Sequence, residues 1–167
     1  EIYPSEPTQI SAGAIGELYE GAARPGHFAG VLTVVNRLFE IVKPSAAVFG
    51  EKDFQQLWLI KNYFRKLEIV AVPTVREFDG LALSSRNIRL TQADRVAALI
   101  ISKALKDPTR MHEILATEPA FKLDYAEIID ETTFQKAGAT TQTKRAIIAG
   151  WVNGVRLLDN AVVESNS

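Results

Sequence analysis

At 167 residues, the chain is long enough for one medium-sized domain or two small ones with a buried core. Its 47% hydrophobic and 23% charged residues are typical of a globular protein, and its net charge of −1 gives no electrostatic reason to bind nucleic acid or a membrane surface. The lack of cysteine excludes disulfides and thiolate chemistry. Because the chain opens without an initiator methionine or a signal peptide, we expect it to begin partway through a longer protein.

Residues 1–27 are rich in proline and glycine, which favours turns over long regular elements. Within them, residues 14–20 predict one short helix. Apolar residues then recur at helical spacing from 28 to 42, which predicts an amphipathic helix. The loop before this helix carries Arg24 and His27. On the pattern alone, His27 is explained by capping or packing against the helix that follows.

The next stretch predicts a strand, a glycine turn and a helix. Residues 46–49 form an apolar run typical of a buried strand, Gly50 follows, and helical spacing continues from 53 to 67. A second strand is predicted over 68–75. Two strands joined by a helix imply a parallel pair with a right-handed crossover, as at the end of a doubly wound sheet. Such turns are where open α/β sheets bind anions and nucleotides.

Three side chains in this turn or just after it could bind a ligand. Lys52 could place a positive charge beside phosphate oxygens. Asp53 stands at the N-cap position, where capping its own helix is the favoured role and binding ribose hydroxyls is the alternative. Gln56 lies one helical turn after Lys52 and could hydrogen-bond a small polar substrate.

The second half of the chain has a different pattern. Asp79-Gly80 predicts a turn, and Thr91 to Asp94 resembles a capping box that opens a helix ending near residue 105. A short helix is predicted around 109–116, followed by strands at 123–129, 144–152 and 155–163. Asn153-Gly154 is a strong hairpin signal between the last two strands. We therefore predict two domains, residues 1–76 and 77–167, the second with helices packed on a small antiparallel sheet.

A second polar cluster lies close to this domain boundary, a favoured place for ligand clefts. Ser84, Ser85 and Arg86 offer two hydroxyls and a guanidinium that could hold a triphosphate. The alternative is a serine-rich turn with Arg86 in solvent. Other candidates are weaker: there is no P-loop or dinucleotide-binding motif, and two histidines are too few for a multi-histidine metal site. The acidic residues of 124–131 are typical of a solvated strand edge, and Asp159 is typical of a structural turn.

Four segments together resemble the pantothenate synthetase family, the pantoate–β-alanine ligases. They are EGAARPGHF at 20–28, FGEKDFQQL at 49–57, DGLALSSRN at 79–87 and RLLDN at 156–160. Their order and spacing fit over most of the chain and least well from 105 to 122, where we expect that this chain lacks a loop of the family after residue 105. The resemblance implies an α/β protein in which a partial Rossmann-like, nucleotidylyltransferase-type domain precedes a small α+β domain with an antiparallel sheet.

The resemblance also implies an activity. The family joins pantoate to β-alanine through a pantoyl-adenylate, using ATP and Mg²⁺, as a cytoplasmic homodimer with no nucleic-acid or membrane partner. Lys52 and Arg86 would be catalytic, Gln56 would bind pantoate, and Arg24 and His27 would lie near the pantoate end. No metal ligand is assigned, and the residues implied to contact ATP are Gly50, Glu51, Lys52, Asp53, Val75, Leu83, Ser84, Ser85 and Arg86.

The chain departs from the family at one point. The family's first half carries an H-x-G-H motif and a second pantoate-binding glutamine, and this sequence contains neither. We therefore expect the chain to match the last two-thirds or so of the family and to be catalytically incompetent by itself. The alternatives are a non-catalytic dimerisation or interaction fragment, and another adenylate-forming ligase of the same superfamily.

Overall fold

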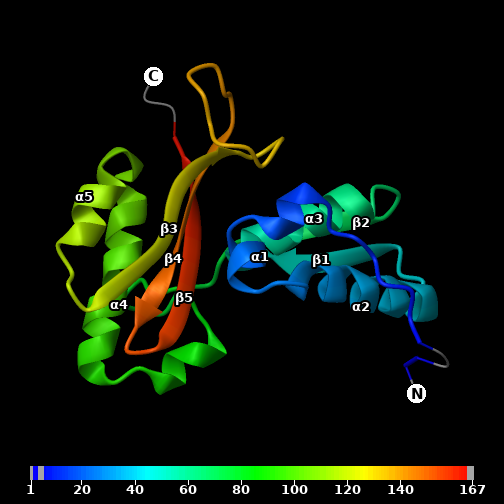
Figure 1. Cartoon of the computed structure of the whole chain (residues 1–167), viewed down its shortest axis with the longest axis horizontal. Coiled ribbons are helices and arrows are strands. Elements are labelled where there is room, and N and C mark those ends of the chain that lie inside the picture. The colour runs from blue at the N-terminus through cyan, green and yellow to red at the C-terminus, as the bar shows by residue number, and fades with distance from the viewer. Residues whose placement is uncertain (1, 4–5, 165–167) are drawn as a thin grey trace. The chain divides into compact units, whose positions relative to one another are not determined.

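The computed structural model describes residues 2–3 and 6–164. The chain divides into two compact units, Glu1–Pro73 and Thr74–Ser167, so the break falls three residues before the predicted boundary at residue 76. Each unit has its own sheet, parallel β1-β2 in the first and antiparallel β3-β4-β5 in the second (Figure 1). The predicted α/β fold class, with a parallel sheet and a separate antiparallel sheet, is confirmed.

The first unit is built around a single strand–helix–strand crossover. Its two strands pair in parallel, with Gly50 opposite Val72, and α2 and α3 flank them in Figure 1. The predicted order of helix, strand, helix and strand from residue 28 onward is confirmed. Its elements are the 3-10 turns Ala14–Glu17 and Glu51–Asp53, the helices α1 (Glu20–Ala23), α2 (His27–Val42) and α3 (Phe54–Tyr63), and the strands β1 (Ala46–Gly50) and β2 (Glu68–Val72).

Two elements of this unit are shorter than their patterns predict. The helix predicted to reach residue 67 ends at Tyr63, because Phe64 leaves the helical conformation at φ −95° and ψ 51°. The Phe64 ring packs edge-on against Phe39 of α2, with centroids 4.8 Å apart. The second strand ends at Val72 instead of residue 75, since Pro73 has no N–H to continue the ladder.

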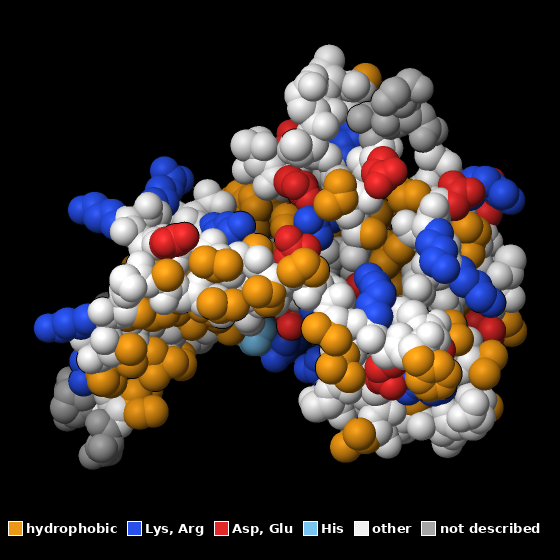
Figure 2. All heavy atoms as spheres, turned by 180° about the vertical axis from the view of Figure 1, so that it is seen from behind, with side chains coloured by type: hydrophobic (Ala, Val, Ile, Leu, Met, Phe, Trp, Pro, Cys, Tyr) orange, Lys and Arg blue, Asp and Glu red, His pale blue; other side chains and the backbone are white. Residues whose placement is uncertain are grey.

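The strand predicted to be buried is covered on one face only. Exposed and half-buried residues alternate along β1 and β2, as in a strand with one packed face. Phe49 points toward α2, whereas Val48 is 65% exposed. Figure 2 shows hydrophobic side chains reaching the surface at many points on the face it draws. The prediction that β1 is buried was therefore wrong for this chain, because a continuous apolar strand is fully buried only where both faces of its sheet are packed.

The second unit confirms both of the local signals found in its sequence. Thr91 and Asp94 form the capping box, in which the Thr91 hydroxyl accepts from the Asp94 N–H at 3.2 Å and the carboxylate accepts from the Thr91 N–H at 3.0 Å. Asn153 and Gly154 both have positive φ, 48° and 73°, as a two-residue hairpin turn requires. The elements are a 3-10 turn (Ser85–Arg89), α4 (Gln92–Lys106), a 3-10 turn (Pro108–Arg110), α5 (Met111–Ala116), β3 (Phe121–Asp130), β4 (Lys144–Val152) and β5 (Val155–Val163).

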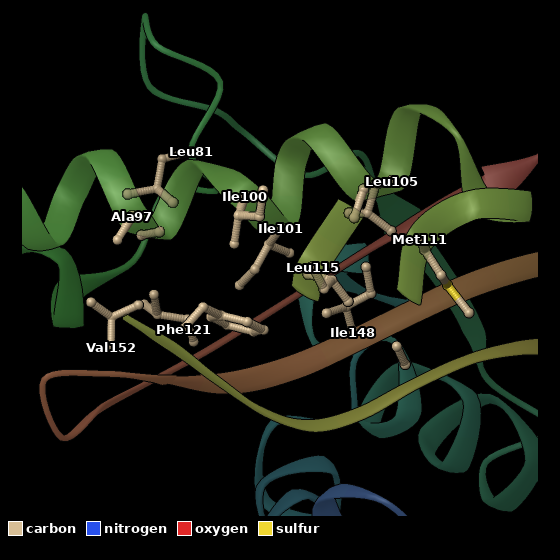
Figure 3. Close-up of a cluster of buried hydrophobic side chains, with 14 of the residues drawn as sticks. Leu81, Ala97, Ile100, Ile101, Leu105, Met111, Leu115, Phe121, Ile148 and Val152 are labelled. Atoms are coloured by element: carbon tan, nitrogen blue, oxygen red, sulfur yellow. The ribbon is translucent and has the colours of Figure 1, made fainter. Parts of the chain in front are cut away.

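The core of this unit lies between its helices and one face of its sheet. Figure 3 shows side chains of α4 and α5 meeting those of β3 and β4. The helical residues recur at spacings of three and four, so they form one apolar stripe along α4. Among the described residues, no helix has both the length and the apolar character needed to cross a membrane. The buried residues of the core include Leu81, Ala97, Ile101, Leu105, Met111, Leu115, Phe121, Ile148 and Val152.

Candidate functional site

The turn after β1 leaves its backbone open to a ligand. Gly50 has an extended conformation (φ −75°, ψ 140°), and a Cβ built on it would meet no atom within 4 Å. A single 3-10 turn, Glu51–Asp53, then leads directly into α3. The carboxyl end of a parallel strand followed by a helix start is the usual anion-binding position of α/β sheets. The geometry of this turn therefore fits the predicted role of residues 50–53.

Asp53 does not cap its helix. It occupies the N-cap position of α3, but its side chain makes no capping hydrogen bond. Its backbone, at φ −91° and ψ 64°, lacks the extended conformation that normally directs an N-cap side chain at the first helical N–H groups. The favoured capping role was therefore wrong, and ligand binding remains as the predicted role of this exposed carboxylate.

The two adjacent glutamines of α3 have different environments. Gln55 is 6% exposed, and its amide oxygen accepts from the Glu20 N–H at 3.1 Å. Its amide nitrogen donates to the carbonyls of Ile15 (2.7 Å) and Leu18 (2.8 Å). Gln55 thus holds the segment before the Arg24–His27 loop against α3. Gln56, the residue predicted to bind substrate, is only half-buried and is not engaged in this bonding.

Arg24 and His27 lie together at the start of α2. A nitrogen of the Arg24 guanidinium is 2.9 Å from Nε2 of His27, and because the guanidinium can only donate, the imidazole nitrogen accepts. The His27 ring also packs against Phe28, with centroids 5.0 Å apart, as the packing interpretation predicted. Helix α1, which precedes these residues, needs Gly21, since a Cβ there would be 1.9 Å from the Gly16 carbonyl oxygen.

In the second unit, the structure brings Val75 next to the residues of the other predicted cluster. The Leu83 N–H donates to the Val75 carbonyl at 2.8 Å, so residues 75–83 form a hairpin, and residues 84–86, the serine loop, follow it. The Ser84 hydroxyl accepts from the Arg86 N–H at 3.2 Å. Val75, Leu83 and Ser85 are exposed and Arg86 is half-exposed. The serine loop is therefore a structured turn that leaves its outer side chains available to a ligand.

The sequence did not reveal the ion pairs that hold the hairpin. Asp159 lies within β5, not in the predicted turn, and its buried carboxylate accepts two hydrogen bonds from Arg76, at 2.6 and 3.1 Å. Arg95 of α4 donates to Glu77 and Asp79, each at 2.6 Å. These hydrogen bonds lower the pKa of both carboxyl groups. The only sequence signal was the mixed charge of the segment REFD at 76–79, which does not identify the residues that pair with it.

Three of the four acidic residues of 124–131 form ion pairs rather than being simply solvated. Their partners come from neighbouring strands and the loop between them, which the linear pattern could not show. One of these partners, Arg145, is almost fully buried. The pairs are Asp124–Arg156 at 2.7 Å, Glu127–Lys136 at 2.9 Å and Glu131–Arg145 at 2.5 Å.

The fold and these clusters define an α/β protein with an open turn at the carboxyl end of a parallel strand and a serine loop in its second unit. Comparison with known proteins gives the family. The family model described as pantoate-beta-alanine ligase matches residues 1–162, and the chain belongs to this family.

Curated relatives support this assignment. The pantothenate synthetase of Acidothermus cellulolyticus is 44% identical over 182 aligned residues, covering 96% of this chain and 60% of its own length. That of Saccharopolyspora erythraea is 43% identical, covering 98% of this chain and 59% of its own length. This chain therefore spans about 60% of the length of these relatives.

Solved structures agree with the fold. The pantothenate synthetase from Thermus thermophilus matches with a TM-score of 0.88 and 39% identity, over 96% of this chain and 65% of that one. A pantoate-beta-alanine ligase from Francisella tularensis, complexed with beta-gamma ATP and beta-alanine, matches with a TM-score of 0.68 and 33% identity, over 93% of this chain and 58% of that one.

Proposed function

We propose that this chain supplies part of the substrate-binding site of a pantothenate synthetase. In this reaction a carboxylate oxygen of pantoate attacks the α-phosphorus of ATP, and the bond to pyrophosphate breaks. The amine of β-alanine then displaces AMP from the pantoyl-adenylate, which gives pantothenate. The open turn after β1, in a chain that belongs to the pantoate-beta-alanine ligase family, is the observation that carries the proposal.

The turn at residues 50–53 and the cluster of Val75, Leu83 and the serine loop contact different parts of ATP. Backbone and side chains of residues 50–53 contact the phosphates and ribose, and Val75 with Leu83 contacts the adenosine portion. Lys52 and Arg86 stabilise the negative charge that develops on the phosphates, while Ser84 and Ser85 donate hydrogen bonds to them. Gln56 binds pantoate. Arg24 and His27, in the same unit as Gln56, lie near the bound pantoate. The Francisella structure, complexed with beta-gamma ATP and beta-alanine, supports these ligand classes.

Magnesium fits this site as a companion of ATP. Across the described ranges, no group of three or more histidine, cysteine, aspartate or glutamate side chains could hold a metal by itself. Mg²⁺ is usually bound by one or two carboxylates plus substrate phosphates, so it does not need such a cage. When bound, it would neutralise charge on the triphosphate. We propose further that the working enzyme is a cytoplasmic homodimer, and that this chain alone cannot turn over because it lacks an H-x-G-H motif.

Calorimetric titration of the 167-residue chain with MgATP tests the binding roles. We expect Lys52→Ala and Arg86→Ala each to weaken binding about tenfold or more, because each removes a charge-assisted hydrogen bond to phosphate. Lys61→Ala and Arg89→Ala are the matched controls, since both residues are exposed cations outside the two clusters. Equal losses in the controls, or no MgATP binding by the parent chain, would contradict the proposal.

A turnover assay separates the alternatives. With ATP, pantoate and β-alanine, we expect no pyrophosphate release from this chain alone, and turnover would refute its incompetence. Binding of neither ATP nor pantoate, together with a stable dimer in solution, would favour a non-catalytic interaction fragment. Binding of ATP together with a different carboxylic acid in a substrate screen would favour another adenylate-forming ligase.

A further inference from the structure

A hydrogen-bond network connects the hairpin of residues 75–83 to α4, a helix with no role in the proposed function. Arg95 lies on the first turn of α4, and its side chain is 19% exposed. One guanidinium nitrogen donates to Glu77 Oε2 and another to Asp79 Oδ2, each at 2.6 Å. Both carboxylates lie at the tip of the hairpin. A single planar guanidinium thus fixes two points of this turn, which a lysine ammonium could not match in geometry.

Glu77 extends the network to the far side of the serine loop. Its second oxygen, Oε1, accepts from Nδ2 of Asn87 at 2.7 Å, and the same nitrogen donates to the Ala82 carbonyl at 3.0 Å. Asn87 is 7% exposed, and its own N–H donates to the Ser84 carbonyl at 3.0 Å. The network therefore runs from Arg95 through Glu77 and Asn87 to the residues on both sides of the serine loop.

We propose that Arg95 is a positioning residue, which holds the serine loop in the conformation that receives the triphosphate. Arg95 acts on residues 84–86 through Glu77 and Asn87. The inference rests on the proposed function of the serine loop as an ATP contact. A preorganised loop binds more tightly than one that must be ordered first, because the apparent affinity falls with the competent fraction.

Hydrogen exchange on the whole chain tests the positioning directly. In Arg95→Gln, we expect the amides of Leu83, Arg86 and Asn87 to exchange about tenfold faster, as loss of a charge-assisted hydrogen bond implies. Amides of β4, in the core of the same unit, should keep their rates. Arg95→Lys should give an intermediate rate, because it can restore one of the two pairs. MgATP affinity should fall several-fold in Arg95→Gln and partly recover in Arg95→Lys.

The matched control is Arg110→Gln. Arg110 also pairs with a carboxylate, that of Glu113, but its side chain is 65% exposed, and the pair joins the 3-10 turn Pro108–Arg110 to α5 instead of holding the hairpin. A second control is Glu77→Gln, whose neutral oxygen can still accept from Asn87. We expect it to keep more protection at the Asn87 amide than Glu77→Ala, which a general loss of stability would not reproduce.

The outcomes are distinct. Unchanged exchange at the serine loop in Arg95→Gln, or equal acceleration throughout β4, overturns the positioning role. Accelerated exchange at the loop with unchanged MgATP affinity overturns it as well, because the ordering would then not matter for binding. If the parent chain binds no MgATP, the proposed function fails, whereas loop-specific acceleration in Arg95→Gln would still show that Arg95 orders the loop.

Discussion

At the scale of single residues, the decisive features are side chains that sequence could not tell apart. Gln55 and Gln56 are adjacent and identical, yet Gln55 is consumed by three hydrogen bonds to backbone groups of residues 15–20. Asp53 could be assigned a capping role from its position, but it is the last residue of the 3-10 turn Glu51–Asp53, and its ψ angle of 64° removes that role. The residue types predicted which positions could bind a ligand. The contacts then showed that Gln55 has a structural role that Gln56 does not share.

The Arg76–Asp159 pair gives a prediction at this scale. The Asp159 side chain is 4% exposed and that of Arg76 is 33% exposed. Replacing Arg76 therefore leaves the buried Asp159 carboxylate without its cationic partner. We expect Arg76→Met to lower the free energy of unfolding by about 2–3 kcal/mol, less than for a fully buried pair because Arg76 is partly solvated. Urea denaturation measures the change.

A double variant separates the pair from other effects of Arg76. Replacing both partners, as Arg76→Met with Asp159→Leu, removes the stranded charge and should recover much of the loss. The pair Arg37–Glu40 serves as the reference, because its arginine is about as exposed as Arg76 (30%) whereas its carboxylate is 54% exposed, so Arg37→Met should cost less than about 1 kcal/mol. Equal costs for Arg76→Met and Arg37→Met would contradict the importance of burial.

At the scale of elements, local signals succeeded where the structure is locally determined. The Thr91–Asp94 capping box and the Asn153-Gly154 turn each depend on a few consecutive residues, and both are present. The end of α3 depends instead on the contact between Phe64 and Phe39, which are far apart in the sequence. The position of Asp159 in β5 is matched to Arg76, 83 residues earlier. Such long-range partners have no signature in a single sequence.

The close packing of β3 on β4 gives a prediction for an element. Gly150 lies opposite Leu123, where the register of β3 shifts by a bulge. A Cβ at Gly150 would be 2.4 Å from Cζ of Phe121 and 2.5 Å from the Lys122 carbonyl oxygen. Because one of these atoms belongs to the backbone, a rotamer change cannot relieve the overlap.

We therefore expect Gly150→Ala to destabilise the second unit by about 1–3 kcal/mol, measured by thermal or urea unfolding. Gly138→Ala is the control, since a Cβ there would meet no atom within 4 Å and its φ is not positive. It should change stability by less than about 0.5 kcal/mol. A tolerated Gly150→Ala would show that the bulge adjusts freely.

At the scale of the whole molecule, the two units differ in how completely their sheets are covered. The second unit packs two helices on three strands around a continuous buried core. The first has a two-stranded sheet with one exposed face, on which Val48, Val70 and Val72 are 65%, 38% and 39% exposed. A two-stranded sheet has little stability of its own, so the first unit depends on its helices for its core.

This difference predicts unequal stability. We expect residues 74–167, expressed alone, to fold and to unfold in one cooperative transition, because their core is contained within them. In the whole chain, amides of β1 and β2 should exchange faster than those of β4, and urea should unfold the first unit at a lower concentration. Exchange measured by mass spectrometry, with the fluorescence of two variants that each keep one tryptophan, Trp58 in α3 or Trp151 in β4, follows the two units separately. A single transition common to both tryptophans would show that the units unfold as one.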